Sequence, residues 1–176
     1  MEVLEIKLRN YQKKNRSDLM ISSYENILVA VDGSKGSNAA FQKSLHIAKR
    51  NNSTLHIVNV IDTSMVTTIP GYEDSLLKEY TKFAEDLLQA HKTIAESFGV
   101  ININLILEYG SPKAIIPKAI VEKVNADLIV CGANGLNALE RFLVGSVSKH
   151  IVQSAICDVL VVRPDKNMEY NNEQIL

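Results

Sequence analysis

The sequence predicts an α/β domain built on a three-layer, doubly wound, five-stranded parallel sheet. Two observations predict this fold class. Five short apolar runs rich in β-branched residues alternate along the chain with segments of helical periodicity. The 176 residues, 46% hydrophobic and 22% charged, match the size and composition of one globular domain. Strict alternation of strands and helices requires parallel pairing through right-handed crossovers, with helices on both faces of the sheet.

The first strand marks where the regular pattern begins. Residues 1–22 are polar, mixed in charge and without a clear period, so we expect an appendage that is either disordered or weakly helical. The run Ile27–Asp32 is then a buried strand that ends in a Gly-Ser turn. Apolar residues recur at helical spacing up to Arg50, which predicts a helix capped by Ser34 or Ser37.

A second strand and a long helix follow. The strand is Thr54–Asp62, and a loop containing Pro70 and Gly71 leads out of it. The helix covers residues 73–97, and Gly99 ends it. One face of this amphipathic helix carries a stripe of residues at helical spacing: Leu76, Leu77, Tyr80, Phe83, Ala84, Leu87, Leu88 and His91.

The second half of the chain continues the alternation. The third strand is Ile101–Glu108, and the next helix opens with Ser111 at its cap and Pro112 at its first position. Pro117 lies inside that helix, where it removes a backbone hydrogen bond and predicts a bend or a distorted turn. A fourth strand (127–132), a short helix (145–154) and a fifth strand (158–163) complete a domain expected to span residues 23–164, before a polar tail over residues 165–176.

Composition excludes several classes of protein. The 19 basic and 20 acidic side chains nearly cancel, so no basic field gathers a nucleic acid. The longest apolar runs fall far short of the roughly 20 residues needed to cross a membrane, and the first residues lack the apolar stretch of a secretory signal. Cys131 and Cys157 have neither CxxC nor zinc spacing, which predicts two reduced, buried thiols. We therefore expect a cytoplasmic protein with no nucleic-acid or membrane partner.

Two strand ends carry turn residues, and a ligand site is expected between them. Asp32-Gly33-Ser34 follows the first strand, and Gly132-Ala133-Asn134-Gly135 follows the fourth. In an open parallel sheet, ligands bind beyond the carboxyl ends of the strands, at the point where the strand order reverses. The sequence therefore predicts a site formed by these two turns.

The segment after the fourth strand has the pattern Gly132-x2-Gly135-x9-Gly145-Ser146, with Ser148 two positions later. Glycines allow a sharp turn with positive φ and leave no Cβ between the main chain and a ligand. A helix that begins near Gly145 offers unpaired N–H groups and a positive dipole end to an anion. The alternative is that the glycines are ordinary loop residues and the serines cap the helix. The pattern is neither a Walker P-loop nor a G-x-G-x-x-G fingerprint.

Residues Tyr24–Arg163, about four-fifths of the chain, resemble the universal stress protein family. The resemblance lies in YENILVAVDGS at the first strand, NVID ending the second, GSP opening the third helix, and DLIVCG-x2-G-x9-GSVS continuing to VLVVR. The complete glycine pattern is similar to the family's ATP-binding branch. The resemblance implies an adenine nucleotide alpha hydrolase-like fold with strand order 3-2-1-4-5. It also implies a bound ATP, or AMP or ADP, with Mg or Mn.

The resemblance also implies which residues contact the nucleotide. Asp32 would lie near adenine or ribose, and the alternative is that it caps the following helix. Val31 and Val60 would flank the base, although both are core residues first. Two glycines would form the phosphate loop, and the helix start would take the phosphates. The full set is Ala30, Val31, Asp32, Val60, Cys131, Gly132, Asn134, Gly135, Arg141, Gly145, Ser146, Val147 and Ser148.

Two departures from the family pattern bear on affinity and strand entry. Asn134 stands where the ATP-binding branch often has His, so this position supplies no positive charge. Asp158 stands where the family often has Pro before the last strand. Arg141, within the nine-residue spacer, either contacts a phosphate or is solvated.

The functional expectation is an ATP-binding switch or sensor of the stress response with slow or negligible turnover. The loop offers no Lys clamp, and the only carboxylates expected near it are Asp32 and Glu140. One alternative is a weak ATPase, or a protein phosphorylated on Ser146 or Ser148 by its own nucleotide. A second is a dimeric scaffold with a vestigial pocket. A homodimer is expected in either case, because the apolar strand Val159–Val162 would form an uncovered sheet edge.

Overall fold

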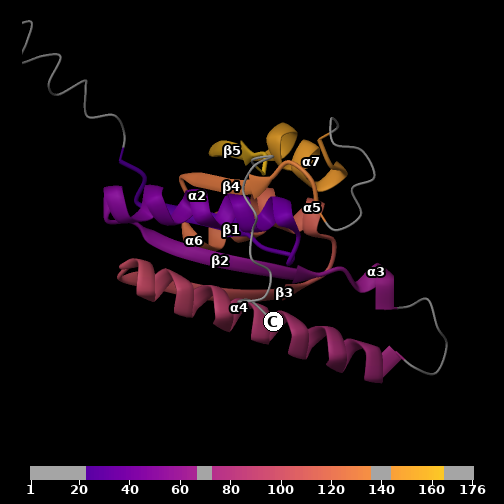
Figure 1. Cartoon of the computed structure of the whole chain (residues 1–176). Coiled ribbons are helices and arrows are strands. Elements are labelled where there is room, and N and C mark those ends of the chain that lie inside the picture. Colours follow the sequence, from indigo (N-terminus) through magenta and orange to yellow (C-terminus); the bar gives the residue numbers. More distant parts are fainter. Residues whose placement is uncertain (1–22, 67–72, 136–143, 165–176) are drawn as a thin grey trace, which may run out of the picture.

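A computed structural model of the chain describes residues 23–66, 73–135 and 144–164 (Figure 1). Five parallel strands form one sheet in the order β3-β2-β1-β4-β5. The strands are β1 (Asn26–Ala30), β2 (Thr54–Ile61), β3 (Asn102–Tyr109), β4 (Leu128–Gly132) and β5 (Asp158–Val162). The predicted fold class, strand number and strand order are therefore confirmed. The predicted strand bounds differ from these by one or two residues at some ends.

Helices cover both faces of the sheet. They are α2 (Lys35–Asn51), α3 (Thr63–Val66), α4 (Glu73–Phe98), α5 (Pro112–Ile115), the π-helical segment η1 (Ile116–Ile120), α6 (Val121–Val124) and α7 (Ser146–Ser154). Helices α2 and α4 lie over one face, whereas α5, η1, α6 and α7 lie over the other (Figure 1). No helix within the described residues is both long and apolar enough to cross a membrane.

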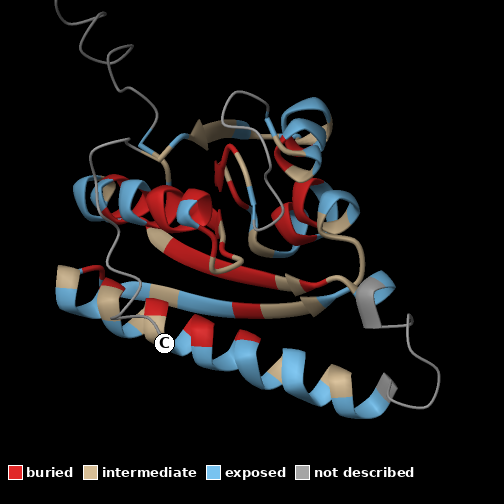
Figure 2. Cartoon of the chain, turned by 45° about the vertical axis from the view of Figure 1, so that its right-hand side comes forward, coloured by how far each residue is buried: buried red, intermediate tan, exposed pale blue. Residues whose placement is uncertain are grey.

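Each face of the sheet has its own hydrophobic core. Neighbouring residues of a strand point to opposite faces, so Ile27 and Val29 join the core under α2 and α4, while Leu28 joins the core on the other side. All three side chains are fully buried because β1 is the central strand. Figure 2 shows the same distribution, with burial concentrated in the middle strands and on the helix faces that contact them.

The helix ends follow the predicted capping residues. Of the two serines considered for α2, Ser34 is the N-cap, and its hydroxyl accepts a 3.1 Å hydrogen bond from the Ser37 N–H. Helix α4 ends before Gly99, whose φ of +93° lies in the left-handed region that favours glycine. The Lys49 ammonium group of α2 donates a 2.8 Å hydrogen bond to the Phe98 carbonyl at that end.

The distortion predicted at Pro117 is a single π-helical stretch. Pro112 occupies the first helical position and Ser111 the N-cap, as expected, although the Ser111 side chain makes no capping hydrogen bond. Pro117 then lies at the start of η1, because a residue without an N–H cannot continue the α-helical hydrogen-bond ladder. The helix resumes as α6, and Ile116, Pro117 and Ile120 are buried.

Two expectations about buried side chains need correction. The stripe on α4 is buried at Ala84, Leu87, Leu88 and His91, but Tyr80 and Phe83 are 42% and 44% exposed. This helix runs antiparallel to the strands, so its first half lies at their carboxyl ends rather than over the middle of the sheet (Figure 1). Cys131 is buried as expected, whereas Cys157 is only partly buried, and both thiols are free. The expectations for residues 1–22, the loop at Pro70 and Gly71, and the tail over residues 165–176 lie outside the described residues.

Candidate functional site

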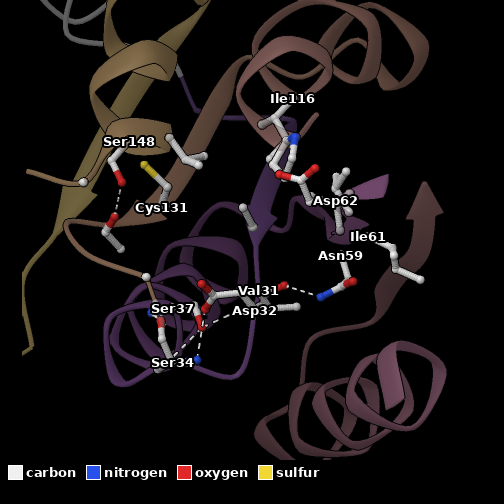
Figure 3. Close-up of a pocket in the computed structure, with 18 of the residues that line it drawn as sticks. Val31, Asp32, Ser34, Ser37, Asn59, Ile61, Asp62, Ile116, Cys131 and Ser148 are labelled. Atoms are coloured by element: carbon white, nitrogen blue, oxygen red, sulfur yellow. Dashed lines mark hydrogen bonds between the residues drawn. The ribbon is translucent and has the colours of Figure 1, made fainter. Parts of the chain in front are cut away.

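A cavity of about 640 Å³ opens at the carboxyl ends of the strands. It lies where the chain leaves β1 towards one side of the sheet and β4 towards the other, the switch point predicted from the sequence. Figure 3 shows labelled side chains from the β1–α2 turn, α2, β2, β4, α7 and η1 around this space. Twelve of the thirteen predicted site residues line it: Ala30, Val31, Asp32, Val60, Cys131, Gly132, Asn134, Gly135, Gly145, Ser146, Val147 and Ser148. Arg141 lies outside the described residues.

Asp32 forms part of the turn between β1 and α2. Its Oδ1 accepts a 2.9 Å hydrogen bond from the Ser34 N–H, and its own N–H donates to the Ser37 hydroxyl at 3.3 Å. Asp32 therefore stabilises the turn that precedes α2, whereas the cap of that helix is Ser34, so the capping role considered as an alternative for Asp32 is wrong. The second carboxylate oxygen, Oδ2, lies 2.7 Å from the position that a Cβ on Gly135 would occupy. Asp32 thus joins the two turns of the switch point, with its carboxylate on the cavity wall.

The loop glycines allow segments of backbone to approach closely. A Cβ on Gly132 would lie 2.7 Å from the Gly36 carbonyl oxygen and 2.8 Å from the Ser37 nitrogen. A Cβ on Gly36 would in turn clash with the Asn134 carbonyl oxygen. The expected positive φ is absent at Gly132 and Gly135, since the described glycines with positive φ are Gly33, Gly99 and Gly110. Glycine is needed at position 132 because the first turn of α2 packs directly on the end of β4.

The start of α7 faces the cavity beside this loop. Gly145 is the N-cap, and its N–H donates a 2.7 Å hydrogen bond to the Ala133 carbonyl. The N–H groups of Ser146, Val147 and Ser148 have no acceptor within the helix, because the first turn of any α-helix lacks them. These groups and the helix dipole make this end of the cavity electropositive.

The two serines of α7 have different environments. Ser146 is exposed, at the first helical position. Ser148 is 5% exposed, and its hydroxyl donates a 2.6 Å hydrogen bond to the Gly132 carbonyl. Beside it, burial raises the pKa of the Cys131 thiol to about 11, although a hydrogen bond with Ser148 acts in the opposite direction. Cys131 is therefore a neutral thiol on the cavity wall.

Much of the remaining cavity lining is apolar, and the sequence predicted only some of these residues. Val31 is 3% exposed, and its N–H donates to the Val58 carbonyl at 2.9 Å, so Val31 is a core residue as expected. The Asn59 side-chain amide donates to the Val31 carbonyl at 2.8 Å and fixes the adjoining end of β2. The missed apolar lining residues come from β2, α4, α5, η1 and α7: Val58, Ile61, Tyr80, Phe83, Ala84, Pro112, Ile116 and Ile151.

A simple signal would have found some of the missed residues. The end of β2 must lie next to the end of β1 in the predicted strand order, so Asn59, Ile61 and Asp62 follow from topology alone. Ser34 and Ser37 follow from the turn after β1 in the same way. No local pattern in the sequence places the α4 side chains at the cavity.

The charged side chains among the described lining residues are all acidic. They are Asp32, Asp62 and Glu79, whereas only Asp32 and Glu140 were expected, and Glu140 lies outside the described residues. Asp62 Oδ1 accepts hydrogen bonds from the Ser64 N–H at 3.0 Å and the Ser64 hydroxyl at 2.7 Å. Within the described residues, no group of three or more His, Cys, Asp or Glu side chains converges on a possible metal position.

Comparisons with known proteins agree on one family. The family model described as "Universal stress protein family" matches residues 23–163. A curated Staphylococcus epidermidis protein that carries this family's name is 49% identical over 153 residues, which cover 87% of this chain and 92% of the relative.

Solved structures give the same result. The universal stress protein UspA from Lactobacillus plantarum superposes with a TM-score of 0.73 at 33% identity, covering 80% of this chain and 98% of that one. A universal stress protein crystallised in complex with cAMP superposes with a TM-score of 0.62 at 25% identity, covering 82% of this chain and all of that one. The adenine nucleotide alpha hydrolase-like fold expected from the sequence is thereby confirmed.

Proposed function

The chain belongs to the universal stress protein family, and from that premise we propose that it binds an adenine nucleotide in the cavity at the β1–β4 switch point. Binding would serve as a switch or sensor in the stress response, with slow or negligible turnover. ATP is the nucleotide that the glycine pattern favours, as in the family's ATP-binding branch. A similar universal stress protein has been crystallised with cAMP, which supports an adenine nucleotide as the class of ligand.

The observation that carries this proposal is the separation of polarity within one cavity. At one end lie the start of α7 and the loop from Gly132 to Gly135, which offer N–H groups and a helix dipole. Apolar side chains of β2 and α4 line another part of the cavity. A nucleotide has the same two parts, an anionic phosphate end and a flat, largely apolar base. The volume of about 640 Å³ lies within the usual range for small-molecule sites.

The charges around the cavity favour binding over catalysis. Phosphoryl transfer requires a positioned nucleophile and cationic groups that stabilise the developing charge. The described lining residues include no Lys, Arg or His, and their charged members are Asp32, Asp62 and Glu79. Arg141 is the one basic residue in the 136–143 segment of the sequence. We therefore keep weak ATP hydrolysis as the second candidate rather than the first.

If phosphate is transferred to the protein, Ser146 is the acceptor that the geometry favours. Its hydroxyl is exposed at the start of α7, whereas the Ser148 hydroxyl is buried and donates to the Gly132 carbonyl. Incubation with γ-labelled ATP tests this candidate directly. Label that stays on the protein and is absent from Ser146→Ala would show phosphorylation of Ser146 and would reject a function limited to binding. Release of labelled phosphate at the rate of a dedicated ATPase would also reject it.

The central test measures which small molecules are released from the purified protein and whether ATP raises its Tm. Purified protein is denatured, and the released small molecules are analysed by mass spectrometry. The nucleotide-free protein is then heated with and without millimolar ATP and magnesium. A ligand at 100 times its Kd stabilises the folded state by about 2.7 kcal/mol, which raises the Tm by several degrees. An unchanged Tm together with no released nucleotide would reject the proposal and favour a dimeric scaffold with a vestigial pocket.

A further inference from the structure

We propose that Tyr80 and Phe83 of α4 form the wall on which the base of the bound nucleotide stacks, an inference that rests on the proposed function. Both side chains line the cavity, and both are unusually exposed for large apolar groups, at 42% and 44%. They belong to the same stripe of α4 as Leu87 and Leu88, which are 3% exposed. The stripe is therefore buried at Leu87 and Leu88, whereas Tyr80 and Phe83 remain exposed and line the cavity.

The ring of Phe83 reaches towards the β1–α2 turn at the cavity. Its ring atom Cζ lies 3.7 Å from the position that a Cβ on Gly33 would occupy. Gly33 has a φ of +81°, in the left-handed region that favours glycine, and its missing side chain leaves room for the ring. The ring thus reaches from α4 to the turn that carries Asp32. Because Phe83 lines the cavity and is 44% exposed, much of its surface is free to contact a ligand.

The chemistry of this wall fits a flat base better than other parts of a nucleotide. Tyr80, Phe83 and Ala84 provide an apolar surface, and the carboxylates Asp62 and Glu79 beside them repel phosphates. The electropositive start of α7 lies at the polar end of the same cavity. A ligand with its phosphates at α7 therefore has its base end available for the aromatic rings. Stacking of one base on an aromatic side chain strengthens binding by about 5- to 150-fold.

The absence of tryptophan from the chain allows a direct optical test. The variant Phe83→Trp carries one indole at the proposed stacking position. It is titrated with ATP and magnesium, and separately with inorganic tripolyphosphate and magnesium, while indole emission is recorded. We expect ATP to quench the emission and tripolyphosphate, which has no base, to leave it unchanged.

Ile101→Trp is the matched control. Ile101, directly before β3, is 82% exposed and lies at the amino ends of the strands, away from the cavity at their carboxyl ends. Its indole should report no change with either ligand. Equal quenching of both indoles by ATP would indicate collisions in solution and would overturn the proposal.

Affinity measurements separate this inference from the proposed function. Equilibrium dialysis with labelled ATP is performed on the unaltered protein and on Phe83→Ala and Tyr80→Ala. We expect a loss of about 5- to 150-fold in at least one variant, with little change in the binding of tripolyphosphate. If the unaltered protein binds ATP and both variants bind it equally well, the stacking wall is wrong and the proposed function stands. If the unaltered protein binds no nucleotide, both proposals fall.

Discussion

The hydroxyl of Ser148 donates a 2.6 Å hydrogen bond to the carbonyl oxygen of Gly132. This contact fixes the first turn of α7 over the last residue of β4, and Ser148 is only 5% exposed there. Ser148 therefore acts as a structural link between the helix start and the glycine loop. Ser146, two positions earlier and exposed, remains available to a ligand. The two hydroxyls that look equivalent in the sequence thus have different expected roles.

The first prediction concerns these two serines. Replacing Ser148 by Ala removes a buried hydrogen bond and leaves its acceptor without that donor, so the free energy of unfolding should fall by about 1–3 kcal/mol. Ser146→Ala should change stability by less than about 0.5 kcal/mol, because the side chain is exposed, while lowering nucleotide affinity. Urea unfolding and ATP titration measure the two effects. The assignment is wrong if Ser148→Ala is as stable as the unaltered protein.

A second prediction concerns Gly132 and Gly145, which differ in what an added side chain would contact. A Cβ on Gly132 would meet the backbone of Gly36 and Ser37, which cannot move without displacing α2. Gly132→Ala should therefore lose about 1–3 kcal/mol of stability or fail to fold. At Gly145 the nearest atom to a new Cβ is the Ala133 carbonyl oxygen at 3.4 Å, and the backbone, with φ of −61°, is accessible to any residue.

Gly145→Ala is for this reason the better probe of ligand binding. Its cost in stability should stay below about 1 kcal/mol, while the added methyl group at the helix start should weaken ATP binding. Thermal unfolding and ATP titration of both variants provide the comparison. A stable Gly132→Ala variant would show that the close approach of α2 to β4 can relax, contrary to this account.

The fold was predictable because its signals are local. Apolar runs such as Ile27–Val31 mark buried strands, and turn residues after the first and fourth strands mark the switch point. The role of Gly132 was not predictable, since its closest neighbours, Gly36 and Ser37, lie almost one hundred residues earlier in the sequence. The α4 wall was missed for a similar reason. Tyr80 and Phe83 continue the stripe of Leu87, and only the length of the sheet under that helix determines which of them are covered.

A third prediction follows from a histidine in the core. His91 is fully buried, and its Nδ1 lies 2.8 Å from the Leu87 carbonyl oxygen, so this nitrogen carries the proton. Nε2 has no hydrogen-bond partner in the described part of the chain, and the ring packs edge-on against Phe41 at 4.5 Å. Burial lowers the pKa of His91 below its ordinary 6.5, and burial also lowers the pKa of His56.

The sign of the pH effect follows from proton binding. Below about pH 6.5 the unfolded chain takes up a proton at His91 that the folded protein does not, so stability should fall as the pH drops below this value and should not change for this reason above it. Urea unfolding between pH 5 and 8 should show the decline, and His91→Leu should reduce it while leaving the contribution of His56. An unchanged pH profile in His91→Leu would contradict the assignment.

A fourth prediction concerns divalent cations. The charged side chains among the described lining residues are Asp32, Asp62 and Glu79, so they repel a free triphosphate. Magnesium bound to the phosphates, with at most one or two protein carboxylates as further ligands, would offset this repulsion. ATP affinity should therefore fall by roughly 10-fold or more when EDTA removes the cation, whereas AMP affinity should change by only about 2- to 3-fold. Calorimetric titration measures both, and equal ATP affinity with and without EDTA would reject this electrostatic account.

The last prediction concerns the outer edge of the sheet at β5. Within the described sheet, β5 pairs only with β4, and Ile156, two residues before β5, is 63% exposed. The Asp158 N–H and the Val162 carbonyl bond towards β4. Because alternate residues of an extended strand direct their backbone groups to opposite sides, Val159 and Val161 present theirs to the open edge. An apolar edge of this kind favours pairing with a second copy.

We therefore expect a homodimer at micromolar concentration by sedimentation, formed through residues Val159–Val162. Val161→Pro removes one outward N–H without affecting the bonds to β4, and proline is tolerated at such edge positions. The variant should sediment as a monomer and keep the circular dichroism spectrum of the folded protein, while Val152→Thr, outside the strand, should remain dimeric. Since the backbone groups of Val161 have no other role in the described structure, a variant that stays dimeric would show that the dimer forms elsewhere, and a monomeric unaltered protein would remove the dimer altogether.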